Sequence, residues 1–422
     1  MRERSARTMG RVLSTTMKIL ALNCGSSTLK FQLIEIDSEA AAPARGRRLA
    51  GGIVERIGGR AAVDFAVERG KPLRRTAGVA DHAGATRHVL DWLTSAGVLV
   101  PRGLDAVGHR VVHGGDLFVE PTLIDDEVLA AVEALTDLAP LHNAPSLSAI
   151  RAARALLGPG VLMVATFDTA FHRTLPERAS LYAIPPELAD KHRIRRYGFH
   201  GLAHRCMTER YAAITSTPLE KVKLVTLQLG NGCSATAVEG GRSIDTSMGF
   251  TPLEGLMMGT RSGDVDPSLA GFFARREGVD IAEVEGWLNT RSGLLGVSGR
   301  SADMRELLEA EARGDARAAL AVAMFCYRVR KYVGAYLAAL GGANAVVFGG
   351  GIGENAPLVR ARVCAGMGWC GLTIDQDRNT RTVGSEGRIS TDDSAVQAYV
   401  IPVDEESIIA HDAVRCLRRR QE

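Results

Sequence analysis

The sequence predicts an α/β protein that builds two lobes from one duplicated plan, with a central cleft between them. Its 422 residues exceed what one ordinary core supports, so two domains of about 150–200 residues are expected. A strand–turn–strand unit at residues 18–30 recurs in the same register at residues 223–235. Strands and helices follow each unit in a similar order. The repetition therefore predicts two related halves that face each other.

Small residues form the tips of both strand–turn–strand units. Lys18 aligns with Lys223, Asn23 with Gln228, and Gly25 with Gly230. A turn of Gly, Ser and Asn presents backbone N–H groups in a concavity, and such concavities bind anions. Two of them predict a polyphosphate held from both sides, and hence a nucleotide-dependent phosphotransferase.

The first half reads as a meander of strands followed by helices. Apolar residues three and four apart predict its helices, and alternating or continuous apolar runs predict its strands. The expected strands span residues 19–22, 30–36, 53–57, 61–67, 106–112 and 161–166. The expected helices span residues 83–96, 125–138 and 145–157.

The second half repeats this plan. Its expected strands span residues 222–229, 234–239, 345–348 and 396–401. A long helix at 315–340 ends at Gly341-Gly342, a glycine-rich turn precedes another helix near residue 355, and a C-terminal helix begins near Asp404. The β-β-β-α-β-α order in both halves is typical of actin-like ATPase (ribonuclease H-like) domains of the sugar kinase superfamily. It does not fit a Rossmann or P-loop plan.

These elements set the expected domain limits. Residues 1–16 carry arginines but no apolar signal-peptide stretch, so they are expected to be a disordered extension, or an upstream start before Met17. Residues 17–167 form the expected N-terminal lobe, which a C-terminal helix at 406–422 joins. Residues 168–405 form the expected nucleotide-binding lobe.

Composition excludes several classes of function. Lys and Arg number 51 against 48 Asp and Glu, and a net charge of only +3 gives no reason to expect nucleic acid or a membrane surface as partner. No apolar run approaches the roughly 18 residues that a membrane helix needs. Seven scattered cysteines form no CxxC pair, which favours a reducing, cytoplasmic location.

Charged residues follow two buried strands. Arg110 stands at the end of one strand beside a Gly-Gly turn, and Asp168 directly follows the other. Sites in open α/β sheets gather at such strand ends, so we interpret both residues as functional rather than as structural caps. His200 lies between glycines in Tyr197-Gly-Phe-His-Gly201, which suggests close approach of a ligand. His109, His113 and His204 are expected to be local hydrogen-bonding groups.

Three further segments suggest binding. Residues 245–267 are too glycine-rich for a helix and too hydrophobic for a solvent loop, so a binding loop is expected, with Arg261 as its only cation. Asp303 opens a helix, as an N-cap or as a ligand contact. Carboxylates at residues 404–406 suit either a helix N-terminus or magnesium, and the sequence leaves both open.

In order and spacing, these motifs resemble the acetate kinase family from about Met17 to Arg415. The resemblance implies reversible, magnesium-dependent transfer of the ATP γ-phosphate to acetate, which gives acetyl phosphate and ADP. It also implies that manganese can replace magnesium and that the protein is a homodimer. The motifs that carry it are Asn23-Cys-Gly-Ser-Ser-Thr-Leu-Lys30, His109-Arg-Val-Val-His-Gly-Gly115, Phe167-Asp-Thr-Ala-Phe-His172, Arg196-Tyr-Gly-Phe-His-Gly201, residues 245–267 and Gly351-Ile-Gly-Glu-Asn355.

The same resemblance assigns roles to residues of this chain. The catalytic positions are Asp168, His200, Arg261 and Arg110, and Arg110 also binds substrate. The pocket for the substrate methyl group comprises Val112, Leu141, Phe199 and Pro252. The metal-associated positions are Asn23 and Glu405. The nucleotide-binding positions are Lys30, Leu229, Gly230, Asn231, Gly232, Asp303, Met304, Arg305, Gly351, Ile352, Gly353, Glu354 and Asn355.

The chain departs from the family pattern at a few positions. Gln228 stands where histidine is usual, and its neutral amide can donate to a phosphate but can never carry charge. Thr28 replaces a usual serine, Ala144 a usual proline, and Leu202-Ala203 a Thr-Ser pair. These changes bear on nucleotide affinity and on the substrate side of the site.

The sequence leaves two alternatives to acetate phosphorylation. Propionate or butyrate differs by one or two methylenes, each worth about 1–3 kcal/mol in an apolar pocket, so the acid is not fixed. A non-catalytic actin-like nucleotide switch would not require both Arg110 and Arg261.

A short carboxylate is already ionised at neutral pH and needs no general base. Asp168 is therefore expected to orient an arginine or a magnesium-bound water.

Overall fold

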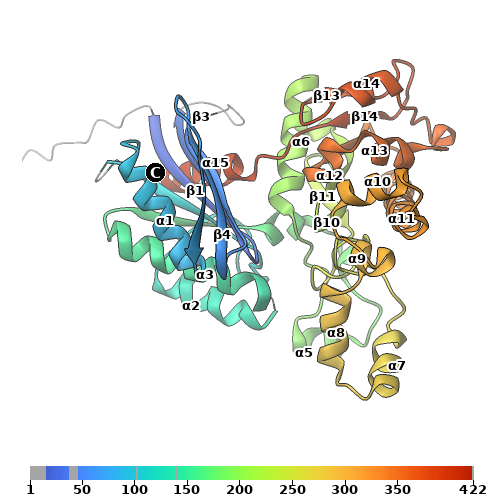
Figure 1. Cartoon of the computed structure of the whole chain (residues 1–422), viewed down its shortest axis with the longest axis horizontal. Helices are drawn as coiled ribbons and strands as arrows, with labels where there is room; N and C mark the ends of the chain where they lie inside the picture. The colour runs from blue at the N-terminus through green and yellow to red at the C-terminus, as the bar shows by residue number, and fades with distance from the viewer. Residues whose placement is uncertain (1–15, 38–45, 101–102, 139, 421–422) are drawn as a thin grey trace, which may run out of the picture.

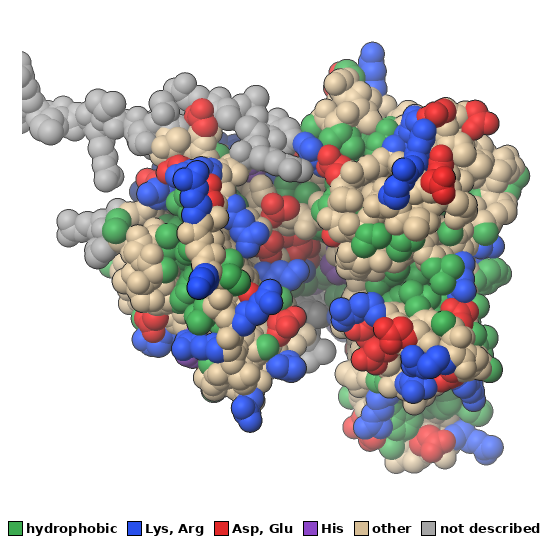
Figure 2. All heavy atoms as spheres, turned by 45° about the horizontal axis from the view of Figure 1, so that its top comes forward, with side chains coloured by type: hydrophobic (Ala, Val, Ile, Leu, Met, Phe, Trp, Pro, Cys, Tyr) green, Lys and Arg blue, Asp and Glu red, His purple; other side chains and the backbone are tan. Residues whose placement is uncertain are grey.

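The computed structural model describes residues 16–37, 46–100, 103–138 and 140–420, without the side chains of residues 137–142. Two mixed sheets lie in separate halves of the molecule, and helices cover them (Figure 1). Residues 1–15, which hold most of the expected N-terminal extension, lie outside the described part. A hollow separates the halves, and acidic, basic and histidine side chains gather in it (Figure 2).

The first half contains an eight-stranded sheet in the order β5-β4-β3-β2-β1-β6-β8-β7. Strands β1, β6 and β8 run parallel, and β1 to β5 form an antiparallel meander. Its strands are β1 (Thr16–Cys24), β2 (Thr28–Asp37), β3 (Arg47–Glu55), β4 (Gly59–Val67), β5 (Leu73–Val79), β6 (Ala106–Val111), β7 (Thr122–Leu123) and β8 (Leu162–Phe167). Its helices are α1 (His82–Ser95), α2 (Asp126–Ala134) and α3 (Pro140–Leu157).

The second half contains a six-stranded sheet in the order β11-β10-β9-β12-β14-β13. Its strands are β9 (Lys223–Leu229), β10 (Cys233–Glu239), β11 (Arg242–Thr246), β12 (Ala345–Gly349), β13 (Gly387–Arg388) and β14 (Gln397–Val400). Its helices are α4 (Glu177–Ser180), α5 (Pro186–His192), α6 (Gly201–Thr215), α7 (Ser268–Glu277), α8 (Ile281–Thr290), α9 (Gly293–Ser298), α10 (Met304–Ala312), α11 (Ala316–Leu340), α12 (Gly350–Asn355), α13 (Pro357–Cys364) and α14 (Gln376–Arg381).

Strand register confirms the duplication. Ile19 of β1 pairs with Ala106 of β6, and its aligned counterpart Leu224 of β9 pairs with Ala345 of β12. In both sheets three antiparallel strands lead into parallel strands in the spatial order 3-2-1-4-5, namely β3-β2-β1-β6-β8 and β11-β10-β9-β12-β14. The turns between β1 and β2 and between β9 and β10 are therefore equivalent points of the two halves.

Several local expectations were wrong. The edge strands β5, β7, β11 and β13 were not predicted. Helix α3 begins at Pro140 and includes Pro145, instead of beginning there. The glycine-rich segment after β12 is the short helix α12 rather than a turn, because Glu354 Oε1 accepts a hydrogen bond from Gly350 N and closes its first turn.

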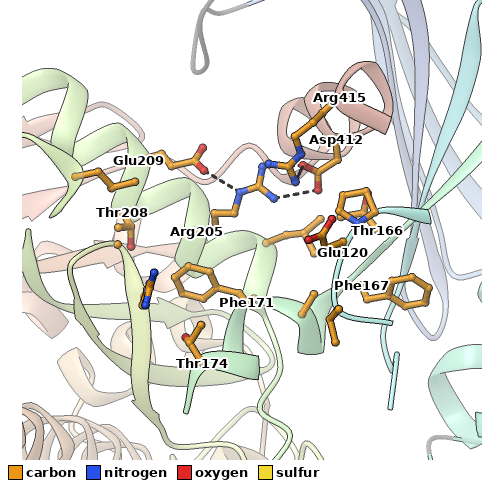
Figure 3. Close-up of a pocket in the computed structure, with 18 of the residues that line it drawn as sticks. Glu120, Thr166, Phe167, Phe171, Thr174, Arg205, Thr208, Glu209, Asp412 and Arg415 are labelled. Carbon is orange, nitrogen blue, oxygen red and sulfur yellow. Dashed lines mark hydrogen bonds and ion pairs between the residues drawn. The ribbon is translucent and has the colours of Figure 1, made fainter. Parts of the chain in front are cut away.

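The C-terminal helix α15 (Glu405–Arg419) returns to the first half and packs on its sheet (Figure 1). Ile409 is fully buried, and a Cβ added to Gly108 of β6 would lie 2.6 Å from Ile409 Cγ2. Arg205 of α6 donates to both carboxylate oxygens of Asp412, at 2.8 and 3.0 Å. Figure 3 shows this pair beside a cavity of about 330 Å³ that residues of both halves line. The ion pair thus joins α6 to α15.

Candidate active site

A buried ion pair lies where two parallel strands end. Arg110 of β6 is in register with Thr166 of β8, so the residue that follows β8, Asp168, reaches the Arg110 side chain. Arg110 Nε donates to Asp168 Oδ1 at 2.9 Å, and Nη2 donates to Oδ2 at 2.6 Å. The Asp168 side chain is fully buried and that of Arg110 is 12% exposed. This bidentate geometry fixes the plane of the guanidinium.

The remaining Arg110 nitrogen points towards the tip of β1. Nη1 donates to Asn23 Oδ1 at 3.2 Å and to the Cys24 carbonyl oxygen at 3.4 Å. Asn23 Nδ2 in turn donates to Glu405 Oε2 at 2.7 Å and to Glu406 Oε1 at 2.8 Å. The structure therefore brings together Asn23 and Glu405, which lie near opposite ends of the sequence.

Two carboxylates, of Glu405 and Glu406, lie close together here, and one of them is buried. Glu406 is 8% exposed, and burial followed by the negative charge of Glu405 raises its pKa. Lys30, the partner of Asn23 across β1 and β2, is the nearby positive charge. Among the described residues, no three His, Cys, Asp or Glu side chains are arranged to hold a metal ion. Magnesium is often bound by one or two carboxylates plus substrate phosphates, so these oxygen groups fit a metal shared with a nucleotide.

His200 and Arg261 converge on the second glycine-rich turn. A Cβ added to Gly232 would lie 3.3 Å from His200 Nε2 and 3.8 Å from Arg261 Nη1. Arg261 Nη1 donates to the Pro252 carbonyl oxygen at 3.1 Å. Among the described residues no carboxylate pairs with Arg261, and burial lowers its pKa. An uncompensated cation in a half-buried position favours an anionic ligand.

His200 is held in one orientation and is neutral. It occupies the left-handed region with φ 58°, directly before α6, and its Nδ1 lies 2.9 Å from Ser234 Oγ. Burial lowers the pKa of His200 to about 3. A neutral imidazole stabilises an anion only through an N–H hydrogen bond, so its tautomer matters.

The predicted apolar pocket is described in part. Val112 and Phe199 are buried in the same core cluster, although Val112 follows a strand of the first sheet. The His113 ring lies 5.6 Å from that of Phe199. Pro252 is half-buried and holds Arg261 through its carbonyl oxygen. Leu141 lies in the first turn of α3, and its side chain is outside the described part of the chain.

Most of the predicted nucleotide-binding residues surround one cavity of about 810 Å³. This cavity lies between the β9–β10 turn, the start of α10 and the helix α12. The predicted residues that line it are Gly230, Asn231, Asp303, Met304, Arg305, Gly351, Ile352 and Asn355. Asp303 also acts as the N-cap of α10, where its Oδ1 accepts from Arg305 N at 2.8 Å. The two interpretations of Asp303 from sequence, an N-cap and a ligand contact, are therefore compatible.

The other predicted nucleotide residues do not line this cavity. Lys30 belongs to the first sheet, and Gly232 faces His200. Leu229 is fully buried at the end of β9. Glu354 Oε1 accepts from Gly350 N and Val403 N, and the Gly353 carbonyl oxygen accepts from Arg360. Glu354 and Gly353 thus brace α12 from inside.

Comparison with known proteins identifies the family. The model of the acetokinase family matches residues 18–411. The chain belongs to the acetokinase family. Acetate kinase of Solibacter usitatus is 53% identical over 407 residues, which cover 95% of this chain and 98% of that protein. Acetate kinase of Chloroherpeton thalassium is 48% identical over 417 residues and is covered completely.

Solved structures agree with this membership. The crystal structure of Porphyromonas gingivalis acetate kinase has a TM-score of 0.86 and 41% identity, and the match covers 95% of this chain and 100% of that one. A propionate kinase from Francisella tularensis has a TM-score of 0.85 and 40% identity over 94% of this chain and 98% of its own. The predicted family, the two-lobed actin-like α/β fold and the phosphotransferase class are confirmed.

Some residues around the site were not predicted from the sequence. Glu406 was noted only as one of several carboxylates, yet it contacts Asn23 as closely as Glu405 does. Gly201 packs so closely on Asp168 that no side chain fits between them. Ser234 contacts His200 directly. His204, four residues after His200 and thus on the same side of α6, was a sequence signal for a shared network.

The departure at Gln228 also has a structural consequence. Gln228 is opposite Ser234 of β10 and Gly349 of β12 in the strand register. Its Oε1 is buried without a hydrogen-bond partner among the described residues. No described helix of the chain combines the length and apolar character needed to span a bilayer.

Proposed function

We propose that this protein phosphorylates acetate with ATP, reversibly and with magnesium, to give acetyl phosphate and ADP. The observation that carries the proposal is the convergence of two groups on Gly232: the neutral His200, and Arg261, which pairs with no carboxylate among the described residues. Gly232 belongs to the same turn as Gly230 and Asn231, which line the 810 Å³ cavity. Anion-stabilising groups thus stand at the phosphate end of a nucleotide-sized cavity.

Charge placement explains the chemistry. The acetate oxygen attacks the γ-phosphorus, the bond to the oxygen bridging the β- and γ-phosphates breaks, and ADP leaves with that oxygen. Because acetate is already ionised, the residues have to bring anions together and spread the charge of the moving phosphoryl group. Arg261 and the Nε2–H of His200 stabilise the phosphoryl oxygens. Arg110, oriented by Asp168, binds the acetate carboxylate.

Asn23, Glu405 and Glu406 would hold the metal ion. When bound, magnesium neutralises part of the charge of the nucleotide phosphates. The two carboxylates share one amide, and the pKa of Glu406 is raised beside Glu405, so a divalent cation would relieve their repulsion. Manganese prefers the same hard oxygen ligands and would substitute.

Acid specificity is the first experiment. Acyl phosphate formation is measured as the hydroxamate with magnesium-ATP and acetate, propionate or butyrate. We expect the highest kcat/KM for acetate, with about a tenfold or larger loss for each added methylene, because Val112 and Phe199 are already buried in a packed core and a longer acid would have to displace such side chains. A preference for propionate would keep the phosphotransferase and change the substrate. Absence of product with every acid would favour a nucleotide switch.

We propose that the protein forms a homodimer in the cytoplasm. Leu320 and Tyr327 are exposed on one face of α11, and Val265 lies beside Met324 of the same face. Such an exposed apolar strip could bind a second copy of the chain.

The seven cysteines, all in the described part, are free, which suits a reducing compartment. Residues 17–167 with the C-terminal helix would form one closing lobe and residues 168–405 the other. Sedimentation of the purified protein tests the dimer.

Gln228→His is expected to introduce a pH dependence into ATP binding. His200 has a pKa of about 3, so it stays neutral between about pH 5 and 8, and glutamine does not titrate. An imidazole has an unperturbed pKa of about 6.5, and burial lowers it, so a histidine at residue 228 would gain its proton below that pH. The KM for ATP of the variant should therefore fall at acid pH relative to the parent. Initial rates across this range, with Gln228→Asn as the neutral control, check the prediction. Parallel profiles of both variants would contradict it.

A further inference from the structure

A buried chain of hydrogen bonds leads from the core of the second sheet to His200. His200 Nδ1 lies 2.9 Å from Ser234 Oγ, which lies 2.8 Å from His204 Nε2. His204 Nδ1 lies 2.8 Å from Thr226 Oγ1. Ser234, His204 and Thr226 are all fully buried. Water therefore does not compete for these groups, and each donor hydrogen has few possible acceptors.

The distances give the chain a direction. The Thr226 hydroxyl has one hydrogen, and its two possible acceptors are His204 Nδ1 at 2.8 Å and the Thr236 carbonyl oxygen at 3.4 Å. Because a separation of 3.4 Å exceeds the usual O–H···O range of about 2.5–3.0 Å, the hydrogen belongs to the contact with His204. His204 Nδ1 is then the acceptor.

The acceptor role of His204 Nδ1 fixes the donor and acceptor roles of the groups that follow. Burial holds the pKa of His204 well below its usual value, so the ring carries one hydrogen, on Nε2. That N–H donates to Ser234 Oγ, and the Ser234 hydroxyl then donates to His200 Nδ1. His200 is neutral as well, so its hydrogen lies on Nε2, which faces Gly232. The chain thus ends in an N–H donor on the side of Arg261.

We propose that Ser234 and His204 are positioning residues that lock His200 in the tautomer protonated on Nε2. The opposite tautomer would present a lone pair to an incoming phosphoryl oxygen, and two negative regions would repel. Locking avoids the cost of charging a buried imidazole, because a neutral ring already supplies the donor. This inference rests on the proposed role of His200 in phosphoryl transfer, and its first readout is independent of that role.

The first readout is the tautomer in the free enzyme. Nuclear magnetic resonance of isotope-labelled histidine nitrogens distinguishes a protonated Nδ1 from a protonated Nε2, and His200→Gln identifies the His200 signals. We expect His200 protonated on Nε2 in the parent enzyme, and both tautomers in Ser234→Ala. A parent enzyme protonated on Nδ1 would overturn the proposal. Because no substrate is present, this result stands even if the acid assay fails.

The second readout is turnover. Ser234→Ala should lower kcat about tenfold, less than removing a donor outright, with little change in either KM. Thr226→Val should also lower kcat, and Thr226→Ser, which keeps the hydroxyl, should restore it. The matched control is Ser394→Ala, because the buried Ser394 Oγ also makes side-chain hydrogen bonds, to the Gly371 and Val396 carbonyl oxygens, but is not part of this network. Unchanged kcat in Ser234→Ala, or an equal loss in Ser394→Ala, would refute the positioning role.

Discussion

Arg110→Ala should lower turnover about 100- to 1000-fold, the effect typical of losing one anion-stabilising donor. It should also lower the free energy of unfolding by about 3–5 kcal/mol, because it leaves the fully buried Asp168 carboxylate without its ionic partner. Steady-state kinetics and urea unfolding measure the two effects. A variant with both near the parent values would show that neither substrate binding nor stability depends on Arg110.

A second substitution separates these two effects. In Arg110→Ala/Asp168→Ala no buried charge is left unpaired, so stability should recover while turnover stays low. Asp168→Asn keeps the shape of the side chain but removes its charge and weakens its grip on the guanidinium. Near-normal turnover of Asp168→Asn would rule out an essential charge at that position and would leave Arg110 oriented by its contacts with Asn23 and Cys24.

Gly201→Ala should lower turnover about 100-fold, because a displacement of about 1 Å at a reacting group can have that effect. A Cβ at Gly201 would overlap the Asp168 carbonyl oxygen and would lie 2.9 Å from Phe171 Cβ. Neither backbone nor Cβ can rotate away, so α6 must move, and His200 at its start moves with it. The overpacking should also cost about 1–3 kcal/mol of stability.

Gly334→Ala is the matched control for this prediction. Gly334 lies within α11, and an added Cβ there would meet no atom within 4 Å. The substitution should leave kcat unchanged and raise the free energy of unfolding by up to about 1 kcal/mol, since alanine has the higher helix propensity. If Gly201→Ala kept the parent kcat, the contact between α6 and Asp168 would not position His200.

The fold was accessible from sequence because its signals are local. Apolar periodicity marked the long strands and helices, and small residues marked the two equivalent turns at Gly25 and Gly230. Short edge strands such as β7 and β13 lacked this signal, because two residues carry no period. The sequence predicts a turn in the glycine-rich segment at residues 349–355, whereas Gly350–Asn355 forms the helix α12, in which Glu354 accepts a hydrogen bond from Gly350 N.

The sequence by itself determined the family, the duplicated α/β plan and most residues around the cavity of about 810 Å³, because these depend on motifs whose members are neighbours in the chain. Only the tertiary structure decided which groups are paired. Asp168 forms an ion pair with Arg110, while Arg261 has no carboxylate partner in the described residues. Ser234 links His200 to His204 through hydrogen bonds. Pairing depends on distances of about 3 Å between residues that are far apart in the chain, and no local pattern encodes such distances.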